Sequence, residues 1–283
     1  RPGTNAHKKN WGNDMRLKDK VAIITGGAHG MGEAEARLFA KEGAAVIIAD
    51  RRADLGEALA ADITASQGRA SFVAMDVAQE ADWKRLIERA LSDYGCIDIL
   101  VNNAGFGVMG PVLDAGSEGL RAQFEVNVFA VMDLTQACLP LLLQSQGLIV
   151  NTGSVSGVLT TPFAGVYCAS KAALHSLSDA LRMELAPLGV RVLTVQPGAI
   201  DTGFASRAKQ QAEQLLKPDS LWWPMREGVM LRANASQNQP TSAESFAKSL
   251  VLELNKADCS GVVGIGHGAV TLPLLARLLP QKW

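Results

Sequence analysis

A strand, a glycine-rich turn and a helix follow one another near the start of the chain. Val21 to Thr25 is a short apolar run rich in β-branched residues, which predicts a strand buried on both faces. It leads into T-G-G-A-H-G-M-G, residues Thr25 to Gly32, and Glu33 to Glu42 then has helical periodicity. Because strands that alternate with helices form parallel sheets, this segment predicts an α/β fold.

The glycines of this turn predict a dinucleotide site. Gly26 permits the tight turn, Gly30 lets a pyrophosphate approach the backbone, and Gly32 allows the helix to pack closely on the strand. The free N–H groups and the dipole of the helix N-terminus favour the anion. The spacing is G-x-x-x-G-x-G rather than the commoner G-x-G-x-x-G, and a merely structural turn is the alternative interpretation.

The alternation of strand and helix continues along the chain without an internal repeat or a linker. Further strands are expected at residues 44–49, 71–75, 97–101, 148–151, 191–195 and 262–265, and helices at residues 82–92, 117–143, around 167–185 and 242–255. The sequence therefore predicts a single-domain, Rossmann-like doubly wound sheet of about seven parallel strands over residues 15–268.

Asp50 follows the second predicted strand, about twenty residues after the glycine turn. A carboxylate there suits hydrogen bonding to an adenosine ribose 2′-hydroxyl and repels a 2′-phosphate, so it favours NAD(H) over NADP(H). Three neighbouring side chains argue the other way, because Arg51, Arg52 and His29 could meet a phosphate. NADP(H) therefore stays open as the alternative cofactor.

Tyr167 and Lys171 form a pair that can transfer protons. They are four residues apart and share a face on a helix. An ammonium about 4 Å from a phenol, at an effective dielectric constant of about 20, favours the phenolate by roughly 4 kcal/mol, or about three pKa units before the cost of desolvation. Ser154, after the strand at 148–151, could donate a hydroxyl to the same reacting oxygen.

These motifs in chain order resemble the short-chain dehydrogenase/reductase family, in its non-extended branch. The resemblance extends over about Leu17 to Ile265 and rests on six motifs: Thr25–Gly32, Asn102–Gly105, Asn127, Ser154, Tyr167–Lys171 and Pro197–Gly198. The family implies a catalytic tetrad of Asn127, Ser154, Tyr167 and Lys171. Tyr167 would be the general acid and base, Lys171 would lower its pKa and bind the nicotinamide ribose, Ser154 would hold the substrate oxygen, and Asn127 would anchor a water in the proton relay.

The resemblance also implies a set of cofactor-binding positions. They are Gly26, His29, Gly30, Met31, Gly32, Asp50, Arg51, Asp76, Val77, Asn103, Ala104, Gly105, Tyr167, Lys171, Pro197, Gly198, Ile200 and Thr202. One departure is that Gly153 stands where the family often has a serine.

Three segments lie outside the pattern of alternating strands and helices. Residues 201–240 are expected to be a long irregular loop, either a lid over an apolar substrate or a segment that packs on the sheet or on a neighbouring subunit. Residues 269–283 form an apolar tail whose longest run ends before Arg277, too short to cross a bilayer. Residues 1–14 are expected to be a tag-like or disordered tail.

Composition excludes several other functions. The net charge of −1 gives no reason to expect a nucleic-acid partner, and we expect no transmembrane segment. The four cysteines are scattered without a C-x-x-C pair, which favours a cytoplasmic location, and the dispersed histidines show no metal-ligand cluster.

We therefore expect an enzyme that interconverts a secondary alcohol and a ketone by hydride transfer. Residues 106–188 resemble hydroxysteroid dehydrogenases, retinol dehydrogenases and acylglycerone-phosphate reductases, which implies a hydrophobic substrate such as a steroid, retinoid, lipid or aromatic alcohol. The family also implies a homodimer or homotetramer. The alternative from another class is a catalytically silent NAD-binding redox sensor or scaffold protein.

Overall fold

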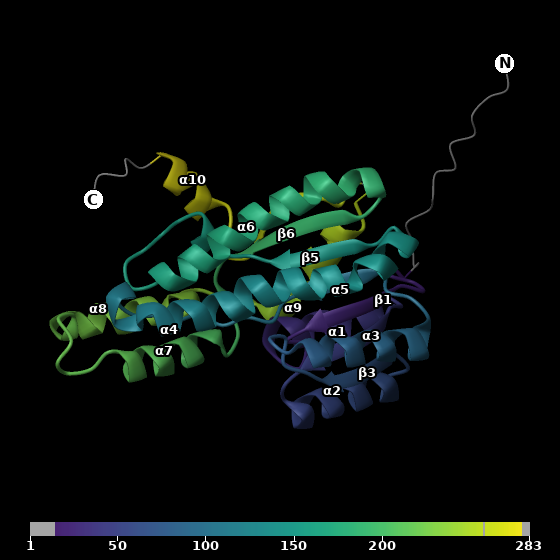
Figure 1. The fold of residues 1–283 in the computed structure, drawn as a ribbon, viewed down its shortest axis with the longest axis horizontal. Coiled ribbons are helices and arrows are strands. Elements are labelled where there is room, and N and C mark those ends of the chain that lie inside the picture. Colours follow the sequence, from purple (N-terminus) through teal and green to yellow (C-terminus); the bar gives the residue numbers. More distant parts are fainter. Residues whose placement is uncertain (1–14, 257, 279–283) are drawn as a thin grey trace, which may run out of the picture.

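The computed structural model describes residues 15–256 and 258–278, and a seven-stranded sheet lies at its centre (Figure 1). The predicted tail at residues 1–14 lies outside the described part. The strands of the sheet are β1 (Val21–Thr25), β2 (Ala45–Asp50), β3 (Arg69–Ala74), β4 (Ile99–Asn102), β5 (Leu148–Thr152), β6 (Arg191–Pro197) and β9 (Gly261–Ile265). All neighbouring strands are parallel, which confirms the predicted fold class.

The order of the strands places the ligand site. It is β3-β2-β1-β4-β5-β6-β9, so the direction of winding reverses between β1 and β4. Ligands of doubly wound sheets bind outside the carboxyl ends of the strands at such a reversal. The glycine turn after β1, Asp50 at the end of β2 and the segment after β4 all lie at this edge.

Both faces of the sheet are buried, which explains why its strands read as continuous apolar runs. Ile24 and Ile48 belong to the core on one face, with Phe39 and Phe246 from the covering helices. The intervening residues of the same strands, such as Ile23, belong to the core on the other face.

The described part of the chain contains ten α-helices. They are α1 (Gly30–Lys41), α2 (Ala53–Ala65), α3 (Glu80–Tyr94), α4 (Val112–Phe124), α5 (Ala130–Ser145), α6 (Gly165–Leu185), α7 (Phe204–Leu215), α8 (Arg226–Ala233), α9 (Ala243–Leu254) and α10 (Thr271–Leu278). Helices α1, α2 and α9 contribute to the first core, and α3, α5 and α6 to the second. The apolar tail predicted after residue 268 thus contains a helix, α10.

The long helix predicted at residues 117–143 is interrupted. A π-helical turn, η1 (Glu125–Phe129), separates α4 from α5, and Gly116 inside α4 has φ 58° and ψ −167°. Since a π turn inserts one residue into the helical repeat, it changes which side chains face the core. Asn127 lies in this turn and is fully buried.

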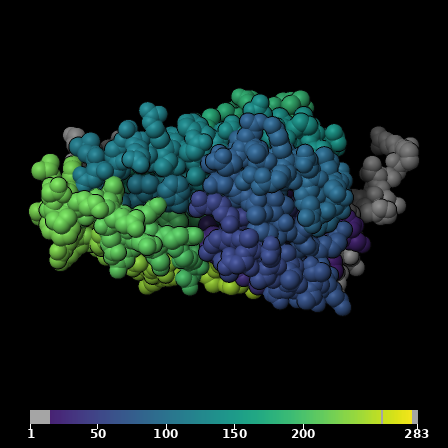
Figure 2. Space-filling model, turned by 60° about the horizontal axis from the view of Figure 1, so that its bottom comes forward, coloured from purple at the N-terminus to yellow at the C-terminus, as the bar shows by residue number. Residues whose placement is uncertain are grey.

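The prediction of an irregular loop at residues 201–240 is wrong, because most of this segment is helical. Helices α7 and α8 lie between two short strands, β7 (Ile200–Asp201) and β8 (Thr241–Ser242), which pair in parallel and hold the ends of the segment together. We call residues 202–240 the cap. In Figure 1, α7 and α8 extend with α4 beyond one end of the sheet, and Figure 2 shows the cap, in green, beside the blue N-terminal half.

One apolar segment passes the length and hydropathy test for a membrane span. It is Val112–Ser145, whose most apolar 18-residue window has a mean hydropathy of 1.6. In the fold this segment is α4, η1 and α5, and α5 supplies buried Leu134 and Leu142 to the core beneath the sheet. The structure therefore uses it as a helix of the core.

Glu35 on α1 is the one carboxyl group that the apolar core encloses without a partner among the described residues. The residue is fully buried and neither oxygen has a hydrogen bond. Burial raises the pKa of this carboxyl to about 8, so it is protonated in the folded protein at neutral pH. The unfolded chain ionises near the ordinary value, and the free energy of unfolding must therefore fall as the pH rises between about 4.5 and 8.

Glu35→Gln should remove this pH dependence. Relative to the variant, the wild type should lose roughly 3–4 kcal/mol of unfolding free energy between about pH 5 and pH 8, with a slope that reaches about 1.4 kcal/mol per pH unit between the two pKa values. Urea denaturation at both pH values measures this difference. Glu33→Gln, on the same helix but exposed, is the control and should follow the wild type. Equal pH slopes in wild type and Glu35→Gln would contradict the assignment.

Candidate active site

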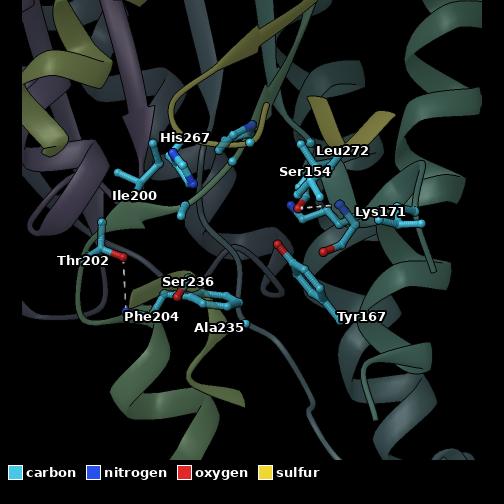
Figure 3. Close-up of a pocket in the computed structure, with 18 of the residues that line it drawn as sticks. Ser154, Tyr167, Lys171, Ile200, Thr202, Phe204, Ala235, Ser236, His267 and Leu272 are labelled. Atoms are coloured by element: carbon cyan, nitrogen blue, oxygen red, sulfur yellow. Dashed lines mark hydrogen bonds between the residues drawn. The ribbon is translucent and has the colours of Figure 1, made fainter. Parts of the chain in front are cut away.

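A cavity of about 450 Å³ lies where the strands β5 and β6 end, between the sheet and the cap. Figure 3 shows the oxygen of Tyr167 pointing into it beside Ser154 and Lys171, with Phe204 and Ser236 of the cap on the far side. The structure thus brings three of the four predicted catalytic residues to one cavity. Asn127 is not among the residues that line this cavity.

The ends of β5 and α6 position these side chains. Strand β5 ends at Thr152, so Ser154 lies just past its carboxyl end, and Tyr167 and Lys171 lie in the first turns of α6. The Lys171 Nζ donates a hydrogen bond of 2.6 Å to the Thr152 carbonyl and lies 6.0 Å from the centre of the Tyr167 ring. Both side chains are at least 90% buried.

Burial, not the charge of Lys171, has the largest effect on the ionisation of Tyr167. It raises the pKa of the Tyr167 phenol, and the opposing effects come from the neighbouring Ser154 side chain and from the charge of Arg232. Burial also lowers the pKa of the Lys171 ammonium to about 8. Desolvation, which the estimate from the sequence left out, is thus the largest influence on both groups.

Asn127 is held by backbone and side chain groups of its surroundings. Its Nδ2 donates to the Phe106 carbonyl at 3.0 Å and to the Ser170 Oγ at 3.2 Å, and its Oδ1 accepts from the Phe106 N–H at 3.3 Å. A Cβ at Gly105 would lie 3.1 Å from this Oδ1 and 3.8 Å from the Lys171 Nζ. The absence of a side chain at Gly105 therefore leaves a gap between the amide and the ammonium.

His175 is a site residue that the sequence analysis missed. It lies on α6 one turn after Lys171, and its Nε2 accepts the Ser154 backbone N–H at 3.2 Å. Burial, helped by the charge of Lys171, lowers the pKa of His175 to about 4, so the ring is neutral at pH 7 and can accept this bond. A Cβ at Gly153 would overlap the Nε2 of the same ring. The departure from the family at Gly153 is thus the signal that could have revealed His175.

The glycine turn packs closely against the segment after β4. Gly26 and Gly30 have positive φ values of 62° and 59°, and a Cβ at Gly32 would overlap the Gly26 carbonyl oxygen. Asn103 donates to the carbonyls of Thr25 and Gly26. Its Oδ1 is buried and has no partner among the described residues, and Asn103 also lines the cavity. This unused acceptor fits a polar group of a bound ligand.

Asp50 is anionic and lies at the end of β2. Its Oδ2 accepts from the Ala28 N–H at 3.1 Å and its Oδ1 from the Arg52 N–H at 3.0 Å. Burial would raise the pKa of the carboxyl, but His29 and the two backbone N–H groups outweigh it and lower the pKa to about 2. An anionic acceptor at this position fits the hydroxyls of a ribose.

The cap reaches this carboxylate through Arg207, a second residue that the sequence analysis missed. The Arg207 guanidinium on α7 lies 2.7 Å from the His29 Nε2, and the His29 Nδ1 lies 3.4 Å from the Asp50 Oδ2. Because arginine only donates, the His29 Nε2 accepts this bond, while the His29 Nδ1 is buried beside Asp50 without a hydrogen bond among the described residues. The sequence separation of 178 residues hides this contact from any local pattern.

The remaining predicted cofactor residues divide into two groups. Those that line the cavity are Met31, Asn103, Gly105, Tyr167, Lys171, Pro197, Gly198, Ile200 and Thr202, while Gly26, His29, Gly30, Gly32, Asp50, Arg51, Asp76, Val77 and Ala104 lie outside its lining. Arg51 forms an ion pair of 3.5 Å with Asp76, and Val77 packs partly into the core. In the described ranges, no three His, Cys, Asp or Glu side chains are grouped as metal ligands.

Comparison with known proteins agrees with this geometry. Residues 20–213 match the family described as short chain dehydrogenase. The chain belongs to the short-chain dehydrogenase/reductase family. This confirms the family resemblance of the sequence, and the protein is an oxidoreductase of the class that uses a nicotinamide dinucleotide.

Similar members of the family come from bacteria. A cyclopentanol dehydrogenase of Comamonas sp. is 38% identical over 73% of this chain and 84% of its own length. A 2,5-dichloro-2,5-cyclohexadiene-1,4-diol dehydrogenase of Sphingobium indicum is 37% identical over 71% and 82%. The crystal structure of a Burkholderia phymatum family member in complex with NAD is 27% identical, with a TM-score of 0.80 over 93% of both chains.

The packing of His175 against Gly153 predicts how substitutions at this pair behave. In this short-chain dehydrogenase/reductase, Gly153→Ser should lower turnover by about 10- to 100-fold, because the new side chain displaces either the imidazole or the Ser154 segment. Gly153→Ser combined with His175→Ala should recover at least about tenfold of that loss, because the smaller side chain makes room.

Steady-state turnover and NADH affinity measured by fluorescence together test this pair. NADH affinity should stay within a few-fold in every variant, and Ser176→Ala, next to His175 but exposed, should behave as wild type. A double variant no more active than Gly153→Ser alone would show that a clash with His175 is not what lowers the turnover of Gly153→Ser.

Proposed function

We propose that this enzyme interconverts a secondary alcohol and a ketone, with NAD(H) as the hydride acceptor and donor. The observation that carries the proposal is the buried Tyr167 hydroxyl, which shares its cavity with Ser154 and Lys171. These are groups that can bind an oxygen, exchange its proton and balance its charge. A nicotinamide bound beside them would supply the hydride chemistry.

Each residue has a distinct part in the proposed proton transfer. In alcohol oxidation Tyr167 accepts the hydroxyl proton, and in ketone reduction it returns a proton to the oxygen. Ser154 hydrogen-bonds the same oxygen as its charge changes. The positive charge of Lys171 stabilises the Tyr167 phenolate. Because the pKa of Lys171, about 8, lies close to neutral pH, its ammonium can also pass a proton on. A water in the gap at Gly105, held by the second lone pair of the Asn127 Oδ1, would continue the relay.

Tyr167→Phe should abolish this chemistry while leaving the fold and the cofactor site intact. Turnover should fall by at least about 100-fold, because no other hydroxyl in the cavity shares its position, and NADH affinity should change only a few-fold. Absorbance of NADH with a panel of cyclic ketones measures the turnover. Tyr94→Phe, which changes the other tyrosine of the chain, is the matched control. Near-native turnover of Tyr167→Phe would remove Tyr167 from the mechanism.

We propose NAD(H) as the preferred cofactor because of Asp50. Its carboxylate is buried and anionic, and it would repel a 2′-phosphate. The cations that could bind such a phosphate are partly engaged: Arg51 with Asp76, and Arg207 with His29. Arg52 lies 3.9 Å from Asp50 through its Nε and remains the strongest argument for NADP(H).

Asp50→Ala should shift the cofactor preference toward NADPH. The ratio of kcat/KM for NADPH to that for NADH should rise by about 100-fold or more, because the variant loses the ribose acceptor and the repelling charge. Asp54→Ala removes an exposed carboxylate a few residues away and should leave the ratio unchanged. A wild type that already prefers NADPH would contradict the role of Asp50.

The proposed substrate has an apolar body. Phe106, Met109, Leu159, Phe204 and Leu272 line the cavity. Because the cavity of about 450 Å³ also includes predicted cofactor residues, only part of it is left for the substrate. This favours a ring-sized alcohol or ketone, in line with the names of the Comamonas and Sphingobium relatives, over a steroid or retinoid. The resemblance to hydroxysteroid and retinol dehydrogenases stays a prediction.

We also propose that the enzyme is a cytoplasmic homodimer or homotetramer. Exposed apolar side chains on α5, α6 and the turn before α5, such as Phe129, Leu177 and Met183, are consistent with self-association. None of the four cysteines forms a disulfide, as expected for a reducing compartment. A catalytically silent NAD-binding sensor would not need Tyr167, Lys171 and Ser154 to share a cavity, so the geometry favours the enzyme.

A further inference from the structure

The cavity that contains Tyr167 is lined by two strongly basic side chains and by no acidic one. Lys171 and Arg232 are the basic residues, and no Asp or Glu occurs among the described residues that line it. Arg232 comes from α8 of the cap, a segment in which the sequence analysis singled out no charged residue. The mechanism proposed above uses Lys171 and leaves Arg232 without a role.

Two hydroxyl groups hold the Arg232 guanidinium in place. Its Nε donates to the Thr161 Oγ1 at 2.6 Å, and a terminal nitrogen donates to the Ser156 Oγ at 3.4 Å. A guanidinium has five N–H donors, so three are left without an acceptor in the part of the chain that the structure describes. No carboxylate of the described residues lies within 4.0 Å of it.

The position of Arg232 relates it to the reacting oxygen. Ser156, which accepts from Arg232, donates its own backbone N–H to the Ser154 Oγ at 3.1 Å. Burial raises the pKa of Tyr167, but the charge of Arg232 acts in the opposite direction, so its field reaches the phenol. The guanidinium is therefore linked to Ser154 through Ser156, and it lines the same cavity as Ser154 and Tyr167.

A second polar group that lines the cavity lacks a hydrogen-bond partner. The hydroxyl of Ser236, four residues after Arg232, is buried without a hydrogen bond in the described structure, and Figure 3 shows Ser236 at the edge of the cavity. Buried polar atoms are rarely left unpaired, so a ligand atom is the natural partner. The Arg232 guanidinium and the Ser236 hydroxyl are thus two groups of the cavity lining that can each bind an anionic oxygen.

We propose that Arg232 binds a carboxylate of the substrate, so that the enzyme acts on cyclic or branched hydroxy acids and keto acids with an apolar body. This rests on the proposed function and narrows its substrate class. A guanidinium can meet both oxygens of a carboxylate with parallel N–H donors, which fixes the orientation of the substrate as well as its charge.

The assignment also explains how Tyr167 can work beside an anionic substrate. A carboxylate in the cavity would by itself disfavour the phenolate, because like charges repel at short range in a medium of low dielectric constant. Arg232 offsets this charge where it binds. The alternative, that Arg232 only fastens the cap to the segment 155–161, accounts for the two hydroxyl contacts and leaves its other donors without a use.

A matched pair of ketones tests the proposal. We would compare 3-oxocyclohexane-1-carboxylate with its carboxamide, which has nearly the same shape and no charge, as substrates with NADH. The wild type should prefer the carboxylate by about 30-fold or more in kcat/KM, and Arg232→Gln should reduce this preference to within about threefold. Taking the ratio within one variant cancels any effect of Arg232 on the ionisation of Tyr167.

Two further variants and a binding measurement complete the experiment. Arg232→Lys should keep part of the preference. Arg226→Gln removes a cation of the same helix that instead stacks on Trp223 outside the cavity, and it should behave as wild type. Calorimetry of the carboxylate with the NADH-bound enzyme should show binding that weakens at least about tenfold in Arg232→Gln, while NADH affinity is unchanged.

The outcomes separate this inference from the proposed function. If wild type reduces the carboxamide as well as the carboxylate, the oxidoreductase proposal stands and the role of Arg232 is wrong. If neither ketone is reduced but the carboxylate binds in an Arg232-dependent way, the anion site stands and the reaction is wrong. A preference that persists in Arg232→Gln, or a loss of NADH affinity in that variant, overturns the assignment.

Discussion

The burial of two titratable side chains, Tyr167 and Lys171, in one small cavity is the constraint on which the site depends. Burial opposes the charged form of each: it raises the pKa of the phenol and lowers that of the ammonium to about 8. The Thr152 carbonyl partly offsets the cost of burying the Lys171 ammonium, because it accepts a hydrogen bond of 2.6 Å from the Nζ. That bond requires the end of β5 to lie against the first turns of α6, so the packing of the sheet on α6 determines whether Lys171 keeps its charge.

The end of β2 and the cavity around Tyr167 have opposite charges. Asp50, at the end of β2, is strongly anionic, because His29 and two backbone N–H groups lower its pKa to about 2. At the reaction end the charged groups are Lys171 and Arg232, and no described acidic residue lines the cavity. In the proposed function, these charges would favour the orientation of dinucleotide and substrate that brings the substrate oxygen to Tyr167.

The sequence predicted the sheet well and the cap poorly, for physical reasons. Strands buried on both faces, such as β1 and β2, read as uninterrupted apolar runs. In contrast, α7 buries only three alanines, which have helical spacing but are small and weakly hydrophobic, and prolines separate it from α8. Contacts between residues far apart in sequence, such as Arg207 with His29, leave no local pattern at all. Gly153 was visible as a departure from the family, but only the fold shows that His175 fills the space beside it.

The ionisation of Tyr167 tests the central claim most directly, and the chain is suited to it because it has only one other tyrosine, Tyr94. In the Tyr94→Phe variant, labelled with ¹³C at the tyrosine ring carbon that bears the hydroxyl, NMR can follow Tyr167 alone through a pH titration. We expect a pKa above that of an ordinary tyrosine in the free enzyme and a decrease on addition of NAD⁺, and Lys171→Met should remove most of that decrease. A pKa that is the same with and without NAD⁺ would contradict the account.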